Sequence, residues 1–226
     1  MNSTQTNHQL TRQIEALGAG DSSTRLQAAL AIGTHPDGPG LVEALVARCA
    51  IEPDFYVRDM LTWALTRFPA GDTVPRLLAE LRSPVAQARS QSLHTLSKIG
   101  EPDVWPAITR SLLRDADDEV ARSAWRAAVV LVPDGERAGL AAELATQLGR
   151  GDRTVQLSLS RALVALGPVV EAVLEDAVNS TDPAVRAHAV ATERLLRDPD
   201  TGFDQAVDEA KRIVALGPER AREAAC

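Results

Sequence analysis

The sequence predicts an all-α protein, a solenoid of about six helical hairpins with an N-terminal capping helix. One pattern of apolar and small residues recurs along the chain, and its copies start near residues 21, 54, 85, 117, 152 and 182. A second apolar helical pattern follows each copy. The steps of roughly 30 to 35 residues lie in the range in which helical solenoids repeat. We call the two helices of each unit helix A and helix B.

The clearest helix A runs from Asp152 to Gly167. With Asp152 as position 1, apolar residues occupy positions 4, 8, 11, 12 and 15, which lie on one face of an α-helix. The glycine at position 16 ends the helix. Because the other copies place mostly apolar or small residues at these positions, every helix A is expected to bury one face.

Each helix A is followed by an amphipathic stretch that predicts helix B. One hairpin cannot bury both of its apolar faces, so each hairpin is expected to stack on its neighbours. The B helices are expected at residues 41–50, 73–81, 104–113, 138–148, 169–178 and 203–214.

The two ends of the chain differ from the repeats. Residues 1–5 are polar, and we expect them to be disordered. Apolar residues spaced i, i+4 and i+7 from Leu10 predict a lone helix that covers the exposed end of the stack. The cap and the repeats form one predicted solenoid over residues 6–216, and residues 217–226 form a flexible polar tail.

Two short motifs carry a family resemblance. The sequence Asp-Pro-Ala-Val-Arg, at residues 182–186, begins one helix A. The sequence Ala-Leu-x-x-Leu-Gly, at residues 162–167, ends the helix A before it. Over about residues 21–216 the repeat resembles the HEAT family of armadillo-like repeats, in particular the short HEAT-like units first described in phycobilin lyases. The resemblance implies a right-handed superhelix whose B helices line the concave side. It does not imply lyase activity, because many non-enzymes share the repeat.

The resemblance also assigns a role to the arginine at position 5. In such repeats this arginine and the preceding aspartate usually tie adjacent repeats together. Contact with a ligand is the alternative role. Matching arginines stand here at Arg25, Arg58, Arg89 and Arg186.

The net charge and the lack of targeting signals indicate which partners and which cellular location to expect. The net charge is −7, and residues 101–226 carry all of the excess, with 15 basic and 22 acidic residues. An acidic protein is not attracted to phosphate, so nucleic acids and anionic membranes are unexpected partners. The sequence begins with no signal peptide and holds no membrane-spanning run. We therefore expect a cytoplasmic protein, and its alanine- and arginine-rich composition suggests a bacterial source.

No motif in the sequence predicts catalysis, a metal or a cofactor. The four histidines lack metal-binding spacing, and we expect His94 and His188 to be exposed or hydrogen-bonded within the fold. The two cysteines form no metal motif or disulfide framework, and Cys49 is expected in the core. Nucleophile motifs and phosphate-binding glycine loops are lacking. The sequence therefore predicts a protein that is not an enzyme.

The B helices in the middle of the chain carry more basic than acidic residues. If they line the concave groove, this stretch is positive, although ordinary solvated helix charges are the alternative. Arginine binds a carboxylate through two hydrogen bonds, which suits an acidic or helical segment of a partner protein. The candidate contacts are Arg76, Arg110, Arg114 and Arg137.

Four of the seven aromatic residues lie in the second repeat. Tyr56 and Trp63 occupy positions 3 and 10, where most other copies carry polar residues, so both are expected on an outer surface. Exposed Tyr and Trp are favoured anchors of protein interfaces. Packing against the proline-rich segment 34–40 is the alternative role for these rings.

The most direct functional interpretation is a non-enzymatic scaffold or adaptor that binds another protein in its concave groove. The alternative is nucleic-acid binding or repair of alkylated bases, because one group of bacterial proteins with a similar fold excises such bases. Trp105 and the arginines could serve there, but the net charge opposes it. A role as lyase or chaperone of a bilin protein rests on the repeat resemblance alone.

Overall fold

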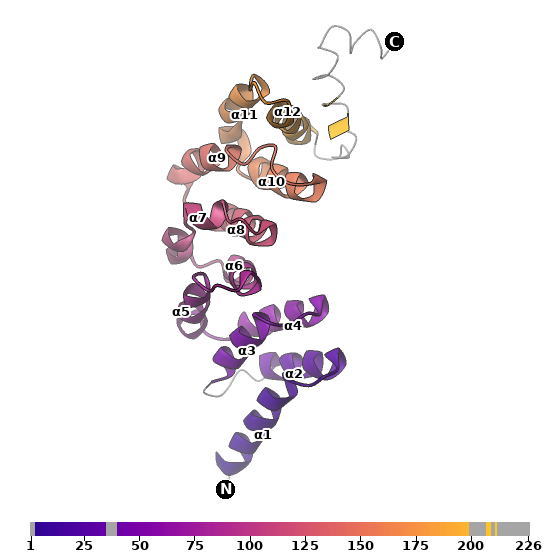
Figure 1. Ribbon diagram of the computed structural model, residues 1–226. Coiled ribbons are helices and arrows are strands. Elements are labelled where there is room, and N and C mark those ends of the chain that lie inside the picture. The colour runs from indigo at the N-terminus through magenta and orange to yellow at the C-terminus, as the bar shows by residue number, and fades with distance from the viewer. Residues whose placement is uncertain (1–2, 35–39, 199–206, 209–210, 212–226) are drawn as a thin grey trace. The chain divides into compact units, whose positions relative to one another are not determined.

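The computed structural model describes residues 3–34, 40–198, 207, 208 and 211. These residues form helices and connecting turns with no strand among them, so the all-α prediction is confirmed (Figure 1). The chain divides into two compact units. The first unit comprises residues 1–108 and 119–131, and the second comprises residues 109–118 and 132–226.

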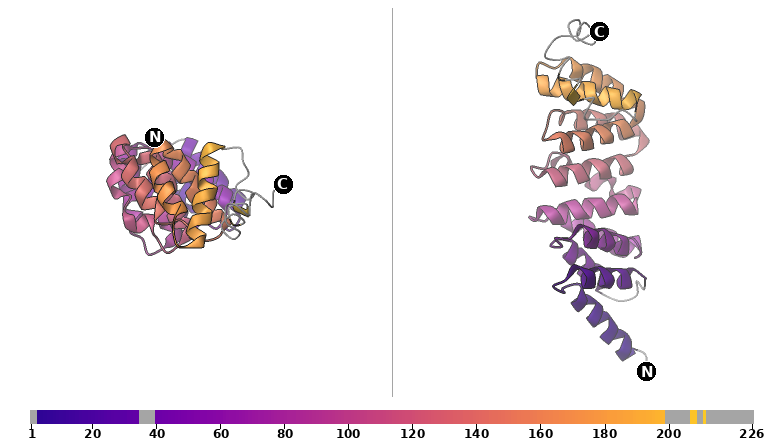
Figure 2. Two further views of the ribbon diagram at one scale, coloured as in Figure 1. Left: turned by 90° about the horizontal axis from the view of Figure 1, so that it is seen from above. Right: turned by 90° about the vertical axis from the view of Figure 1, so that its right-hand side faces the viewer.

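The first unit is built from two layers of helices. Its helices are α2 (Ser22–Thr34), α3 (Leu41–Cys49), α4 (Phe55–Leu65), α5 (Ala70–Glu80), α6 (Ala86–Ile99) and all but the first residue of α8 (Asp118–Leu131). In the A layer, α4 packs against both α2 and α6. In the B layer, α3 packs against α5, and each of these two also packs against the A helix that follows it. Figure 1 shows the two layers side by side, and the right-hand view of Figure 2 looks onto the A layer.

A further helix, α1 (Ser3–Ala16), packs against α2 and α3. This is the place predicted for a capping helix. The helix begins at Ser3, inside the segment that was expected to be disordered, and serine is a favourable residue at a helix start.

The second unit repeats the same arrangement. Helices α10 and α12 pack against each other, and α11 packs against both α9 and α12. One continuous solenoid over residues 6–216 stays a prediction. The elements of this unit are α7 (Arg110–Leu113), η2 (Asp134–Glu136), α9 (Arg137–Ala145), α10 (Arg153–Ala165), η3 (Gly167–Val170), α11 (Glu171–Val178) and α12 (Pro183–Arg197).

The third predicted B helix, at residues 104–113, is not a single helix. The chain forms a 3₁₀ segment, η1 (Pro102–Ala107), and then the short α7. An α-helix that started at Pro102, where η1 begins, would need the N–H of residue 106 to bond the carbonyl of Pro102, and Pro106 has no N–H to donate. The last predicted B helix, 203–214, and the tail 217–226 lie outside the described residues, apart from 207, 208 and 211.

The predicted core positions are confirmed. In α10 and the residue after it, the apolar side chains at positions 4, 8, 11, 12 and 15 are all buried. The small residues at position 8 of α8 and α12, Ala124 and Ala189, are fully buried. Cys49 is also in the core, and burial raises the pKa of its thiol to about 12. This cysteine is therefore an unreactive packing residue.

Candidate functional site

Each of the four arginines predicted to contact a partner forms an ion pair with a carboxylate of the protein itself. Arg76 Nε lies 3.1 Å from Glu43 Oε2, and both side chains are exposed. Arg137 Nε lies 3.2 Å from Asp134 Oδ1. Glu43 is in the preceding B helix, α3, and Asp134 is in the turn before α9, so a count of charges within each arginine's own helix misses both carboxylates.

The other two predicted arginines share one carboxylate. Arg110 and Arg114 both pair with Glu143, and the Glu143 side chain is only 10% exposed while that of Arg110 is 84% exposed. The four arginines therefore face three carboxylates, and most of the expected positive charge is neutralised within the protein.

Tyr56 and Trp63 lie on the surface, as predicted, and so does Phe55, whereas Phe68, the fourth aromatic residue of the second repeat, is buried. Tyr56 is 73% and Phe55 is 66% exposed, and their rings meet edge to face with centroids 5.7 Å apart. The guanidinium of Arg58 lies 5.9 Å from the centroid of the Phe55 ring. We call Phe55, Tyr56 and Trp63 the aromatic cluster.

Trp63 is less exposed than its two neighbours, at 38%. Its ring lies over Gly33 at the end of α2, where an added Cβ would come within 2.4 Å of Trp63 Cζ3 and 2.8 Å of Ala64 Cα. The glycine thus allows α2 and α4 to approach closely. Tyr56 and Trp63 were alternatively expected to pack against segment 34–40, and residues 35–39 of that segment lie outside the described residues.

The position-5 arginines have a structural role, as the resemblance implies. Arg58 donates to the carbonyls of Glu52 and Pro53, at 2.9 and 2.8 Å, and Arg186 donates to those of Ser180 and Thr181. Each guanidinium thereby satisfies carbonyls in the turn that ends the preceding repeat.

The aspartate at position 1 behaves differently from the expectation. It caps its own helix, because Asp54 accepts hydrogen bonds from the N–H groups of Tyr56 and Val57. Asp152 and Asp182 cap α10 and α12 in the same way. In the repeats of Asp54 and Asp182 the arginine, and not the aspartate, joins the helix to the preceding repeat, whereas the repeat of Asp152 carries Gln156 in place of that arginine.

The same signature is detected by comparison with protein families. The family model for HEAT repeats matches residues 42–129, from α3 into α8. Residues 42–129 are HEAT repeats. This agrees with the motif-based resemblance, and the fold class is an all-α solenoid.

Among solved structures, a crystal structure of an engineered protein aligns with the chain at 19% sequence identity and a TM-score of 0.46. The alignment covers 89% of this chain and 100% of the engineered one. The comparison with curated proteins gave no match.

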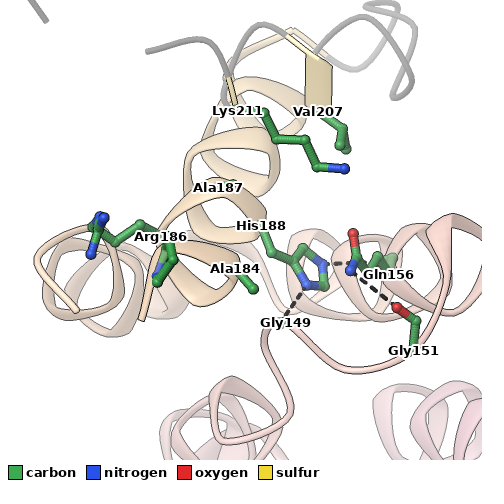
Figure 3. Close-up of a pocket in the computed structure, with 10 residues that line it drawn as sticks. Gly149, Gly151, Gln156, Ala184, Arg186, Ala187, His188, Val207 and Lys211 are labelled. Atoms are coloured by element: carbon green, nitrogen blue, oxygen red, sulfur yellow. Dashed lines mark hydrogen bonds between the residues drawn. The ribbon is translucent and has the colours of Figure 1, made fainter. Parts of the chain in front are cut away.

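A cavity of about 580 Å³ lies in the second unit, beyond the matched HEAT segment. Residues of α12 line it together with Gly149, Gln156 and the side chains of Val207 and Lys211 (Figure 3). The volume is within the range of small-molecule sites. The sequence did not predict this cavity, because the residues that line it are widely separated in the chain.

The polar wall of this cavity is His188, which is buried and fully hydrogen-bonded. Its Nδ1 accepts from the N–H of Gly149 at 3.0 Å, and its Nε2 lies 3.0 Å from the Gln156 carbonyl and from Ser160 Oγ (Figure 3). The neutral ring with the proton on Nε2 satisfies this network. Burial lowers the pKa of His188 to about 4, so the ring is uncharged at neutral pH. His188 is thus a hydrogen-bonded core residue, one of the two roles expected for it.

The described residues include no group of three or more His, Cys, Asp or Glu side chains placed to hold a metal ion. In that part of the chain, too few apolar residues follow one another in any helix for it to cross a membrane. Trp105, the aromatic residue considered for base recognition, lies half-buried in η1.

Proposed function

We propose that this protein is a non-enzymatic scaffold that binds another protein and that the aromatic cluster of its first unit is the principal contact surface. HEAT repeats commonly mediate interactions between proteins, and the cluster lies within the matched segment. The observation that carries the proposal is the exposure of Tyr56 and Phe55, at 73% and 66%. Neither ring is buried in the core of the protein.

The physical argument rests on what these rings gain from a partner. An aromatic side chain buries about 150–250 Å² when it is covered, and Tyr is held by only two side-chain torsions, so its ordering costs little. The Phe55 and Tyr56 rings also hold each other in an edge-to-face contact, which preorganises the surface. Rigid exposed aromatic groups of this kind are typical anchors of protein interfaces.

The arginine surface of the B helices, with Arg76, Arg110, Arg114 and Arg137, is the second candidate for the contact. An exposed ion pair contributes only about 0–1 kcal/mol, so a carboxylate from a partner could replace the internal one. Arg110 is the most accessible of the four. Nucleic-acid binding has less support, because the net charge of −7 and these internal ion pairs both oppose it.

The proposal is tested by affinity capture from a lysate of the source organism. We expect the double variant Phe55→Ser, Tyr56→Ser to lose proteins that the wild type captures. The matched control is Val169→Ser, an exposed apolar residue of the second unit that should leave capture unchanged.

The same experiment compares the two surfaces. A loss of capture in Arg110→Glu, Arg114→Glu, with no loss in the aromatic double variant, would assign binding to the B-helix arginines. Unchanged capture by both double variants, with normal thermal melts, would refute both surfaces.

A further inference from the structure

The A layer of the first unit carries a solvent-accessible residue at position 10 of each helix. Leu30 in α2 and Trp63 in α4 are 36% and 38% exposed, His94 in α6 is half-buried, and Arg126 in α8 is exposed. Position 14 of two of these repeats adds the exposed cations Arg67 and Lys98. We call these six residues the cation–aromatic stripe.

Several contacts show that the stripe is continuous. α4 packs against both α2 and α6, so the position-10 residues of these three helices lie on neighbouring helices. The Arg67 guanidinium lies 6.0 Å from the centroid of the Trp63 ring. Burial together with the positive charges of Arg126 and Lys98 lowers the pKa of His94, so both cations lie near this ring.

The cations of the stripe differ from those of the B helices. Among the described residues, Arg67, Lys98 and Arg126 form no ion pair with a carboxylate, whereas every one of the four predicted arginines does. Arg126 donates only to Ser123 Oγ and the carbonyl of Arg122. Asp59 is the acidic group near His94, and Glu119 is the one near Arg126. The three cations are therefore not held in direct ion pairs, although Asp59 and Glu119 offset part of their charge from nearby.

We propose that the cation–aromatic stripe binds an acidic segment of a partner protein, with an apolar side chain of that segment packed on Trp63 and Leu30. This rests on the proposed scaffold function and names the chemistry of its partner. Unpaired arginines and a lysine beside an indole complement carboxylates beside an apolar side chain. The stripe acts only at short range, because charges are screened within about 8 Å at physiological salt.

A protein segment fits this surface better than a nucleic acid does. Non-specific binding of a nucleic acid is driven by attraction between phosphates and a basic protein surface, and this chain is net acidic. Asp59 and Glu119 would each repel a continuous row of phosphates. A peptide needs only a few carboxylates to pair with the cations of the stripe, and these carboxylates can be spaced so that they avoid Asp59 and Glu119.

The test measures fluorescence anisotropy of a labelled amphipathic peptide that carries glutamates on one face and leucines on the other. The same peptide with glutamines in place of glutamates and a single-stranded oligothymidylate are the other two probes. We expect the full-length wild type to bind the glutamate peptide most tightly. Lys98→Glu with Arg126→Glu should weaken that binding by about tenfold or more, because attraction becomes repulsion.

The control is the equivalent double charge reversal on the B helices, Arg110→Glu with Arg114→Glu, which should change binding of the glutamate peptide less than about twofold. The neutral variant Lys98→Gln, Arg126→Gln should give an intermediate loss. The neutral variant keeps the test valid if the charge-reversed variant does not fold. We expect the thermal melt of the neutral variant to match that of the wild type.

Three results would overturn the inference: no binding of the glutamate peptide by the wild type, equal binding by wild type and stripe variants, or equal binding of the glutamine peptide. Tighter binding of the oligothymidylate through Lys98 and Arg126 would also overturn it and assign the stripe to nucleic acid. These outcomes are distinct from failure of the scaffold proposal, which is decided by protein capture with the Phe55 and Tyr56 variants.

Discussion

At the scale of single residues, Glu52 shows how this fold accommodates a buried charge. Its carboxylate is inaccessible to solvent and accepts hydrogen bonds from Arg25, Arg48 and the N–H of Asp54. Burial opposes its ionisation, but these donors outweigh burial and lower its pKa to about 2. The cluster joins α2 to the turn between α3 and α4, so one side chain connects two repeats.

We expect Glu52→Ala to lower the free energy of unfolding by about 3–5 kcal/mol, because it leaves the buried Arg25 without its partner. Urea denaturation measures the change. Glu43→Ala is the matched control, since it breaks the exposed pair with Arg76 and should cost less than about 1 kcal/mol. Equal losses in the two variants would show that the cluster adds no more than a surface pair.

His188 gives a prediction for pH. Its folded-state pKa of about 4 lies below the usual value of 6.5, so the folded protein favours the neutral ring. This contribution to stability is complete above pH 6.5 and is lost as the pH falls toward 4. Between pH 7 and 5 the wild type should lose about 2 kcal/mol from this group.

His188→Gln should show a correspondingly smaller loss of stability over the same pH range, as measured by urea denaturation at each pH. If the variant and the wild type lose stability in parallel, His188 is not the group that titrates.

At the scale of helices, neighbouring A helices are joined through repeated positions. In each unit a hydroxyl at position 9 of one A helix meets a threonine at position 11 of the next. Thr62 and Thr95 do so at 3.3 Å between α4 and α6, and Ser160 and Thr192 at 2.7 Å between α10 and α12. All four side chains are buried, and because Thr95 and Thr192 donate to carbonyls of their own helices, a shift of either helix would leave the hydroxyl of Thr62 or Ser160 without this acceptor. These pairs specify how far one helix slides along the next.

The fully buried alanines at position 8 predict the cost of overfilling the helix packing. Ala124→Leu in α8 and Ala189→Leu in α12 should each destabilise the protein by about 1–3 kcal/mol. Ala142→Leu, on the exposed side of α9, is the matched control and should change stability by less than about 0.5 kcal/mol. Unchanged melting temperatures in both core variants would mean that these positions tolerate larger side chains.

At the scale of the whole molecule, the net charge and the local charges have opposite consequences. The chain is acidic by seven charges, so at a distance it repels polyanions. Close to the surface, the unpaired Arg67, Lys98 and Arg126 form a positive region that the net charge does not reveal. Under the proposed scaffold function, we expect a partner to be selected by short-range complementarity and not by long-range steering.

This charge balance predicts that the protein does not bind DNA in a salt-dependent manner. In gel-shift titrations between about 50 and 200 mM salt we expect no retained duplex, because too few phosphates could be neutralised to offset the repulsion. A complex that forms at low salt and dissociates steeply with added salt would contradict this prediction. It would favour nucleic-acid binding, the alternative function, over the scaffold.

The sequence by itself determined the repeat and its core. The spacing that buries Leu159, Leu163 and Ala124 is a property of one helix, so the 3.6-residue period reveals it without any partner. The matched HEAT motif follows from the same local pattern. The break at Pro106 was harder to predict, because a proline suits either the first turn of an α-helix or a 3₁₀ segment.

Only the tertiary structure decided which charges are free. Arg110 and Arg114 appeared as an open positive pair in the sequence, but Glu143, 29 residues from Arg114, neutralises much of their charge. His188 likewise acquires its partners from Gln156, in the preceding repeat, and from Gly149, at the end of the repeat before that. Coulomb energy depends on distance in space, and the distance between residues far apart in sequence is set by the stacking of repeats. The helices can therefore be predicted from the sequence. The proposed interaction surface cannot, because it depends on which side chains of neighbouring helices lie close together.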